Sequence, residues 1–287
     1  MKTNKLSLLD QIRTPKTFTI SLFVVGFYGI LALLTSLGWL AADYALVQTD
    51  LSYSPPSIDY FFGTDFLGRS VLSRALKGSE VALIIGFFAA TLSTLIGLAL
   101  GLIGAYFSGW VDDAVVWLYT TLESIPYILL IAGLSFAMGP GLNNLYIALG
   151  LTSWVSLCRL VRAEVYKQKC QDYMAAAESV GASHLRRILY HILPNVYHIA
   201  LIQFTLNFIY AIKIEVILSF LGLGVEPGVP SWGLMINEAK DELTSGVWWG
   251  LASATTMMFI LVLAVNLLVH SLNRSQPFYN NVRHHEF

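Results

Sequence analysis

The side chains that could do chemistry in this sequence do not gather into a catalytic pattern. The six histidines and the two cysteines, Cys158 and Cys170, show no metal-ligand spacing with one another or with carboxylates. No nucleophile has a base at a spacing typical of covalent catalysis, and no Gly-x4-Gly-Lys-Ser/Thr phosphate loop is present. The sequence therefore predicts no catalytic, cofactor or metal site, no ATP hydrolysis by that route, and free thiols.

One carboxylate, that of Glu123, stands in an unusual place. It lies in an apolar stretch that begins near Val111, about 12 residues or about 18 Å into the helix that we expect there. An ionisable group inside a membrane costs at least about 2.5 kcal/mol. Glu123 is therefore expected to face a pathway, a partner chain or a hydrogen-bonding neighbour helix, and the sequence leaves these alternatives open. Pro126 predicts a kink just after it.

The composition explains why this carboxylate is unusual. Hydrophobic residues make up 56% of the 287 residues and charged residues only 12%, with a mean hydropathy of +0.64. This balance excludes a disordered chain, a collagen-like fibre and an ordinary water-soluble enzyme. The formal net charge is −1, so no excess positive charge is left for nucleic acid.

Six stretches are long and apolar enough to cross a bilayer as helices. They cover residues 20–42, 81–111, 111–138, 142–161, 188–212 and 243–273. Within the fifth stretch, 188–212, the helix is expected to start after Pro194. With a cytoplasmic N-terminus, twelve Lys and Arg fall in inside segments and four in outside segments, which favours that orientation. The sequence predicts an all-α polytopic membrane protein with six transmembrane helices and both termini cytoplasmic.

Some residues within the spans carry further expectations. Gly97, Gly101 and Gly104 predict close helix packing in the second span. Lys213 and Glu215 lie near the outer end of the fifth span, where both are expected to reach toward the interface, although a role in transport stays open.

The cytoplasmic loop 162–195 is expected to fold as two short helices around a bend. Residues 172–180 are rich in good helix formers, Gly181 ends this helix, and Ser183 is a plausible N-cap for a second piece that ends at Pro194. Small side chains such as Ala176 and Ala177 allow another protein to approach the backbone closely. An ordinary amphipathic loop and a docking element are equally compatible with this pattern.

The same loop resembles the "EAA" loop of ABC importer permeases. The family pattern is Glu-Ala-Ala, three residues, Gly, about nine residues, then an apolar residue, Leu and Pro. Ala176, Ala177, Gly181, Leu193 and Pro194 match it, whereas Ala175 replaces the leading Glu.

Two more segments resemble the C-type permease subunit of the dipeptide, oligopeptide and nickel class. Residues 62–74, Phe-Gly-Thr-Asp-Phe-Leu-Gly-Arg-Ser-Val-Leu-Ser-Arg, are similar to one signature of this subunit, with Ser70 in place of the usual Asp. Glu215, residues 219–224 and residues 230–233 are similar to another. Asn266-Leu267-Leu268 matches the last helix, whereas Val269-His270 departs from the usual Gly-Asp. The resemblance covers residues 60–270.

This resemblance implies a type I ABC importer permease fold and a bacterial inner-membrane location. The chain would form half of a translocation pore in the lipid bilayer, with a homologous second permease, two cytoplasmic ABC ATPase subunits and a periplasmic solute-binding protein as partners. The implied coupling residues are Ala176, Ala177, Gly181, Leu193 and Pro194. The implied layout is 1–80 for the N-terminus, first helix and periplasmic loop, 81–273 for the transmembrane core, and 274–287 for a cytoplasmic tail.

The outer loop 222–242 is expected to be either a plain connection or part of the periplasmic mouth. The candidate mouth residues are Gly222, Gly224, Pro230, Trp232 and Gly233. Asp65, Arg69 and Arg74 are expected to form a polar cluster at the outer surface with a structural role only.

Two other classes of function remain to be weighed against the importer. An ion-gradient-driven secondary transporter is the main alternative, but that class usually shows internal repeats and more charge deep in the membrane. A membrane enzyme would need a polar catalytic cluster at one interface, and the sequence shows none. The sequence does not identify the solute.

Overall fold

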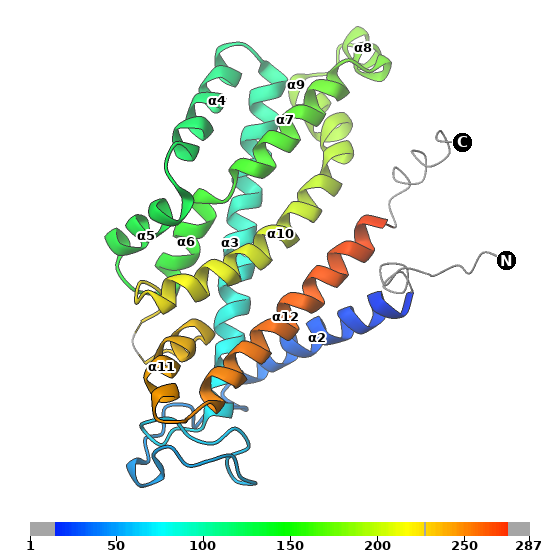
Figure 1. Cartoon of the computed structure of the whole chain (residues 1–287). Coiled ribbons are helices and arrows are strands. Elements are labelled where there is room, and N and C mark those ends of the chain that lie inside the picture. The colour runs from blue at the N-terminus through cyan, green and yellow to red at the C-terminus, as the bar shows by residue number, and fades with distance from the viewer. Residues whose placement is uncertain (1–14, 227, 275–287) are drawn as a thin grey trace, which may run out of the picture. The chain divides into compact units, whose positions relative to one another are not determined.

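The structure is a computed structural model that describes residues 15–226 and 228–274, with side chains for 16–226 and 228–271 (Figure 1). Apart from the helix end at Arg274, the expected tail 274–287 lies outside the described residues. The described chain divides into two compact units. The first contains the residues up to Leu83 together with those that follow residue 227, and the second is Ile84–Glu226.

The described elements are helical apart from one isolated bridge between Thr64 and Ser70. The first unit contains α2 (Pro15–Ser36), the 3₁₀ turn η1 (Thr49–Leu51), the start of α3 (Val71–Phe107), α11 (Trp232–Thr244) and α12 (Trp249–Arg274). The second contains the rest of α3, α4 (Trp110–Glu123), α5 (Tyr127–Met138), α6 (Leu142–Thr152), α7 (Val155–Lys169), α8 (Asp172–Ser179), α9 (His184–Arg186), the π-helical turn η2 (Arg187–Ile192) and α10 (Leu193–Phe220).

Among the described residues, five helical runs are long and apolar enough to cross a membrane. They are Lys16–Ser36, Val71–Phe107, Leu142–Lys169, His184–Phe220 and Trp249–Ser271. The pair α4 and α5 gives a sixth span if the two are counted together, although they meet at 88°. The expected all-α polytopic architecture is confirmed, and the expected number of six is reached when the bent pair is one span.

Several expected boundaries were wrong, because a count of uncharged residues misses charges that lie inside helices. The second span begins at Val71 rather than Val81, since Arg74 is a buried, ion-paired helix residue. The last span begins at Trp249, and much of the expected loop 222–242 is the separate helix α11. The first helix ends at Ser36, shortly before Gly38 takes a left-handed φ of 72°.

In the first unit, α2 packs along α12, and α11 packs against α12 (Figure 1). The Tyr28 hydroxyl donates a hydrogen bond to the Met257 carbonyl at 2.8 Å. The ring of Tyr28 meets that of Trp232 edge to face, with centroids 6.4 Å apart. Trp232 is fully buried, and its Nε1 donates to the Ala75 carbonyl at 3.0 Å. A Cβ atom at Gly78 would lie 2.8 Å from the Trp232 ring, so this helix contact requires a glycine.

The loop before α3 is fixed by a buried charge cluster. The carboxylate of Asp65 accepts hydrogen bonds from the backbone N–H groups of Leu67 and Arg69, each at 2.9 Å. Its Oδ2 lies 2.7 Å from both Arg69 Nε and Arg74 Nη1. Arg74 Nη2 also lies 2.7 Å from Glu238 of α11. The expected cluster therefore forms, but Asp65 and Arg74 are buried, which strengthens their interaction beyond that of a surface pair.

Glu242 is a third acidic residue beside this cluster, and it is 4% exposed. Its Oε1 is buried without a hydrogen-bond partner among the described residues. Burial, followed by the nearby carboxylates of Asp65 and Glu238, raises the pKa of Glu242 to about 6, against the opposing effect of Arg74. Glu242 is therefore protonated more readily in the folded state than in the unfolded chain.

In the second unit, α3 packs closely against α7 through glycines. A Cβ atom at Gly97 would lie 2.7 Å from the Trp154 carbonyl oxygen, and one at Gly101 would lie 2.8 Å from that of Cys158. Gly104 instead meets Asp112 and Val115 of α4, at 3.2 Å each. The expected close packing at these glycines is confirmed.

We predict that Glu242→Gln removes a pH dependence of the local stability of α11. Because the pKa of Glu242 is higher in the folded state than the usual 4.5, its stabilising contribution is complete below about pH 4.5 and is lost as the pH rises through about 6. Over this pH range, the contribution of Glu242 to the free energy of unfolding of the native chain falls by about 2 kcal/mol. Hydrogen exchange of residues 232–244, corrected for intrinsic rates, measures it. The exposed neighbour provides the control, since Asp241→Asn should keep the native pH profile.

Candidate functional site

The loop between α7 and α10 forms a sharp elbow around Gly181. The N–H of Gly181 donates to the Glu178 carbonyl at 2.9 Å, and the N–H of Ala182 donates to the Ala177 carbonyl at 3.0 Å. This pair of bonds is a Schellman motif, which requires a left-handed residue at Gly181, where φ is 75°. Ser183 then caps α9, because its hydroxyl accepts a hydrogen bond from the Arg186 N–H. The expected helix end and N-cap are confirmed.

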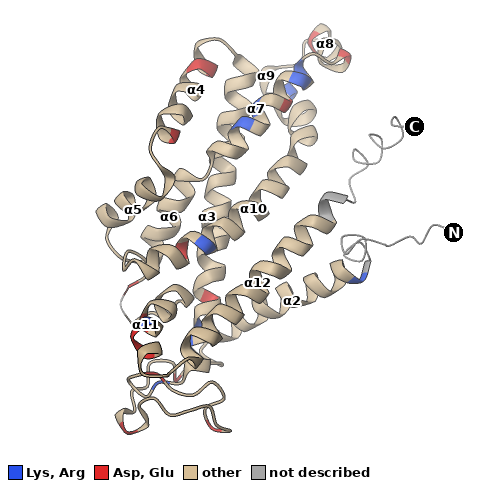
Figure 2. Ribbon diagram, viewed as in Figure 1, with Lys and Arg blue, Asp and Glu red and all other residues tan. Residues whose placement is uncertain are grey.

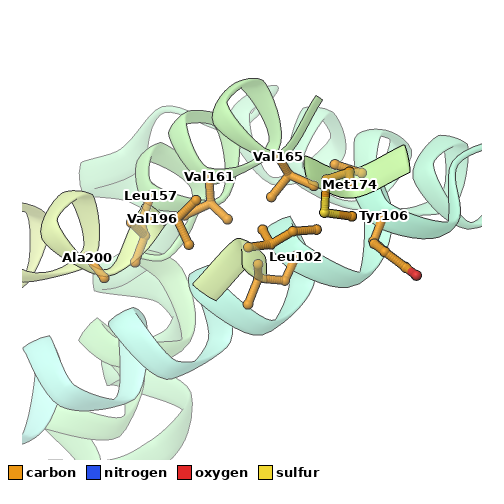
Figure 3. Packing of buried hydrophobic residues seen from close by; sticks show 10 residues of the cluster. Leu102, Tyr106, Leu157, Val161, Val165, Met174, Val196 and Ala200 are labelled. Atoms are coloured by element: carbon orange, nitrogen blue, oxygen red, sulfur yellow. The ribbon is translucent and has the colours of Figure 1, made fainter. Parts of the chain in front are cut away.

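The predicted alanines lie on different faces of α8. Ala176 is exposed, whereas Ala177 is buried together with Met174. Figure 3 shows Met174 within a cluster of buried apolar side chains from α3, α7 and α10. The buried members of this cluster are Leu102, Ala105, Tyr106, Leu157, Val161, Val165, Met174, Ile192, Val196 and Ala200. Only Ala176 of the two alanines is thus available to a partner, and Ala177 serves the attachment of α8.

Polar contacts attach the elbow to the end of α3. Lys169 Nζ donates to the carbonyl oxygens of Ala105 and Tyr106, each at 3.0 Å, and to the Ser108 hydroxyl at 2.8 Å. A positive side chain at the carboxyl end of a helix is favourable. The Tyr106 hydroxyl lies 2.9 Å from His184 Nδ1. The elbow therefore has two connections to α3.

An ion pair closes the elbow on itself. Arg187 Nη1 lies 3.0 Å from Glu178 Oε1, so η2 is joined to the end of α8. The Arg187 guanidinium also lies over the Tyr106 ring, 5.9 Å from its centroid. These contacts were not anticipated from the sequence, since Glu178 and Arg187 are separated by the turn and lie on no common helix.

Leu193 and Pro194 do not end the helical run, contrary to expectation. Leu193 packs partly buried against the apolar cluster, Pro194 is exposed, and one helical run continues from His184 to Phe220. The π-helical turn η2 ends at Ile192, and only Leu193 separates it from Pro194. Such a turn changes the hydrogen-bond register, which allows a residue without an N–H to continue the helix.

The outer surface of the elbow is concave and partly apolar. A hollow of 670 Å³ is lined by Tyr173, Ala176, Ala177, Val180, Gly181, Ala182, Ser183, Arg186 and His191. Val180 is 83% exposed, and Leu185 and Tyr190 are also largely exposed. Exposed apolar side chains around a hollow are typical of a protein-binding surface. The sequence analysis missed these three residues, although an apolar residue just before a helix-ending glycine is a usable signal.

The candidate mouth residues fall in both units. In the second unit, exposed Gly222 has a φ of 78° in the turn after α10, whereas Gly224 is buried, and a Cβ there would lie 2.6 Å from Ser219 Cα. In the first unit, Pro230, Trp232 and Gly233 are all buried at the start of α11. Of the five, only Gly222 lies at the surface.

The sequence analysis placed Glu123 in the middle of a helix, and this was wrong, because Glu123 lies at the end of one. It is the last residue of α4, and its carboxylate forms an ion pair with Arg159 of α7. Both side chains are about half exposed, 40% for Glu123 and 46% for Arg159. The kink expected at Pro126 is a full break between α4 and α5. Arg159, which the sequence analysis did not single out, is therefore part of the same polar site.

A second ion pair joins α4 and α7 beside this site. Arg162 binds Asp112 through two bonds, Nε to Oδ1 at 2.7 Å and Nη2 to Oδ2 at 2.6 Å. Arg162 Nη1 also donates to the Tyr119 hydroxyl at 3.0 Å. Such a bidentate pair fixes both groups in one geometry. Figure 2 shows charged residues on α4 and α7, and more around α8 and α9.

Glu215 was expected to reach toward the interface, and this was wrong. Its side chain is fully buried in α10, where its Oε1 accepts a hydrogen bond from the Ser219 hydroxyl at 2.7 Å. Lys213, two residues away, is exposed, so the two side chains lie in different surroundings. Cys158 is buried, Cys170 is exposed, and both are free thiols. No three potential metal ligands come together among the residues that the structure describes.

Comparisons with known proteins agree on one family. Residues 96–276 match the family described as "Binding-protein-dependent transport system inner membrane component". The chain is 34% identical over 260 residues to the dipeptide transport system permease protein DppC of Bacillus subtilis (strain 168), covering 90% of this chain and 80% of that protein. It is 35% identical over 206 residues to the oligopeptide transport system permease protein OppC of the same organism, covering 72% and 68%.

A relative from another bacterium is also covered nearly in full. The chain is 33% identical over 273 residues to the glutathione transport system permease protein GsiD of Escherichia coli O6:K15:H31 (strain 536 / UPEC), covering 90% of this chain and 89% of that protein. The match therefore includes both described units and not the transmembrane core alone.

We predict that Met174→Ala loosens the elbow from the apolar cluster. Removal of a buried methionine side chain costs about 2–5 kcal/mol, and Met174 is the residue of α8 that Figure 3 shows within the cluster. Hydrogen exchange of residues 172–192 should accelerate strongly while exchange in α12 stays the same. Leu185→Ala serves as the control, because Leu185 is 66% exposed and its truncation should leave these exchange rates nearly unchanged.

Proposed function

Because the chain belongs to the family of binding-protein-dependent transport system inner membrane components, we propose that it is the peptide-carrying permease subunit of an ATP-driven importer. In this proposal it resides in the bacterial inner membrane with both termini in the cytoplasm, and it forms half of a translocation pore. A homologous permease completes the pore, and a periplasmic solute-binding protein delivers peptides. The relatives described above are permease proteins of dipeptide, oligopeptide and glutathione transport systems, which supports this class of solute.

The elbow around Gly181 is the single observation that best supports coupling to an ATPase. It combines an exposed apolar surface, formed by Val180, Leu185 and Tyr190, with a hollow beside Ala176. A matching protuberance or groove on a cytoplasmic ATPase subunit would bury these side chains. Two such ATPases would serve the two permeases, since the sequence has no phosphate-binding loop of its own.

The attachment of the elbow explains how such docking would move the membrane helices. Lys169 and His184 connect it to the end of α3, and Arg187 connects α8 to the helical run that continues into α10. A displacement of α8 would therefore be passed to α3 and α10 as a rigid-body movement. This is the kind of input that alternating access requires.

The function is tested by uptake into proteoliposomes that contain the complete transporter. Labelled peptides are presented outside with the binding protein, and ATP is enclosed with the ATPase side. Uptake that requires ATP and persists in the presence of an ionophore supports the proposal. Uptake that requires an ion gradient and proceeds without ATP would instead support the secondary transporter.

We predict that Val180→Asp abolishes coupling without affecting membrane insertion. A charge placed on a residue that is 83% exposed should not disturb the fold, but it would have to be desolvated at the interface with the ATPase. Co-purification of the ATPase subunits and ATP-dependent uptake should both fall at least about tenfold. Gln171→Asp is the control, because it adds the same charge to an exposed N-cap outside the hollow. Equal losses in both variants would contradict the docking surface.

Two substitutions at Gly181 distinguish the effect of backbone strain in the turn from the effect of added bulk at the docking surface. Gly181→Val places a β-branched side chain at a φ of 75°, which strains the backbone. Gly181→Asn also adds a side chain, but asparagine adopts this left-handed conformation readily. No atom lies within 4 Å of the added Cβ position, so bulk alone leaves the elbow folded. We expect both variants to insert normally and to lose uptake, because a docked partner occupies this space. Normal uptake by Gly181→Asn would contradict close approach at this position.

A further inference from the structure

The ion pair between Glu123 and Arg159 lies within apolar helical stretches that are candidate membrane spans, and it is only half buried. Arg159 is ten residues before the end of the span Leu142–Lys169, which is about 15 Å along a helix. Glu123 is thirteen residues, or about 20 Å, from the start of α4. Lipid exposure of such groups costs several kcal/mol, so this face of α4 and α7 must line a polar space or meet a protein surface.

The side chains around the pair favour a polar space. Thr120, Thr121, Ser124 and Ser156 are all exposed beside it in sequence, each a hydroxyl residue. The hydroxyls of Thr120, Thr121 and Ser124 donate locally to backbone carbonyls, from 2.7 to 2.8 Å, so their lone pairs remain for other donors. Together with the ion pair, they supply polar groups to the exposed surface of a segment that also exposes Trp117 and Leu118.

The break between α4 and α5 points to the same conclusion. The chain leaves the helix at Ser124 and resumes at Tyr127, at an angle of 88°. Irregular backbone at membrane depth is tolerated where it is buried in protein or lines a water-filled cavity. Broken helices of this kind frequently form solute sites.

Arg159 is held in position by contacts other than its ion pair with Glu123. Its guanidinium lies 4.7 Å from the centroid of the Tyr119 ring. Tyr119 is buried, and its hydroxyl accepts a hydrogen bond from Arg162, which is itself bound to Asp112. The arginine therefore keeps its place when Glu123 moves away from it.

We propose that Arg159 and Glu123 bind the carboxylate and the ammonium group of a zwitterionic peptide as it passes through the pore. An opposite-charge pair is neutral overall when no peptide is present, which limits its cost in the membrane. When a peptide arrives, its two termini replace one internal ion pair with two intermolecular pairs. This inference rests on the proposed import function and assigns solute selectivity to two residues of the permease itself.

The experiment uses the complete transporter in proteoliposomes and a labelled pool of dipeptides, whose two termini lie close enough together to reach adjacent side chains. The pool is prepared in three forms: with both termini free, N-acetylated, and C-amidated. The native complex should take up the free form at least about tenfold faster than either blocked form, because one charged hydrogen-bonding pair is lost with each block. Uptake is measured at saturating binding protein, whose occupancy by each form is determined separately.

The substitutions then assign each terminus to a residue. Arg159→Gln should remove the preference for a free carboxylate, and Glu123→Gln the preference for a free ammonium group. The swap Glu123→Arg with Arg159→Glu preserves an ion pair and should not restore uptake. Asp113→Asn is the matched control, since it neutralises another exposed carboxylate of α4 and should keep the native preferences.

Three outcomes would overturn the inference. One is full uptake by the swapped variant, which would make the pair a packing contact. Another is a loss of assembled complex in the single variants in proportion to uptake, which would place the pair at the interface with the second permease. The third is unchanged preference in both single variants. If the native complex takes up no peptide with ATP, the proposed function fails as well, so the two failures are distinguishable.

Discussion

The absence of hydrogen-bond partners in hydrocarbon is the constraint on which this structure depends. Every backbone N–H and C=O group at membrane depth must be paired within the protein, and long continuous helices such as α3 and the run His184–Phe220 satisfy that demand. The same constraint limits where a helix can be interrupted. A break of 88° between α4 and α5, with the charged pair Glu123 and Arg159 at its start, is tolerable only where it is buried in protein or lines a water-filled cavity.

The elbow around Gly181 combines an exposed surface with a firm attachment. Its outer face offers Val180 and the hollow beside Ala176, whereas its inner face places Met174 in the apolar cluster and Lys169 against the end of α3. A loop that was held only at its two ends would deform locally when a partner displaced it. The packed and ion-paired elbow would instead pass a displacement to α3 and α10, as the proposed coupling requires.

Buried charges connect the loop before α3, the start of α3 and α11 within the first unit. Asp65 is bound by two arginines and two backbone N–H groups, and Glu238 and Glu242 of α11 lie beside it. Sequence analysis located this cluster but assigned it to the surface, because burial cannot be read from a list of charges. The difference matters energetically, since charge interactions are far weaker in water than inside a protein. The raised pKa of Glu242 is one consequence.

The sequence by itself determined the all-helical membrane class, the approximate number of spans, the turn at Gly181 and the close packing at Gly97 and Gly101, because these follow from local composition, helix periodicity and backbone sterics. Only the tertiary structure decided that α3 begins at Val71, that a helix passes through Pro194, and that Glu123 meets Arg159. Those features depend on partners that are distant in sequence, and which partner satisfies a buried charge or an interrupted helix is settled only when the helices pack together.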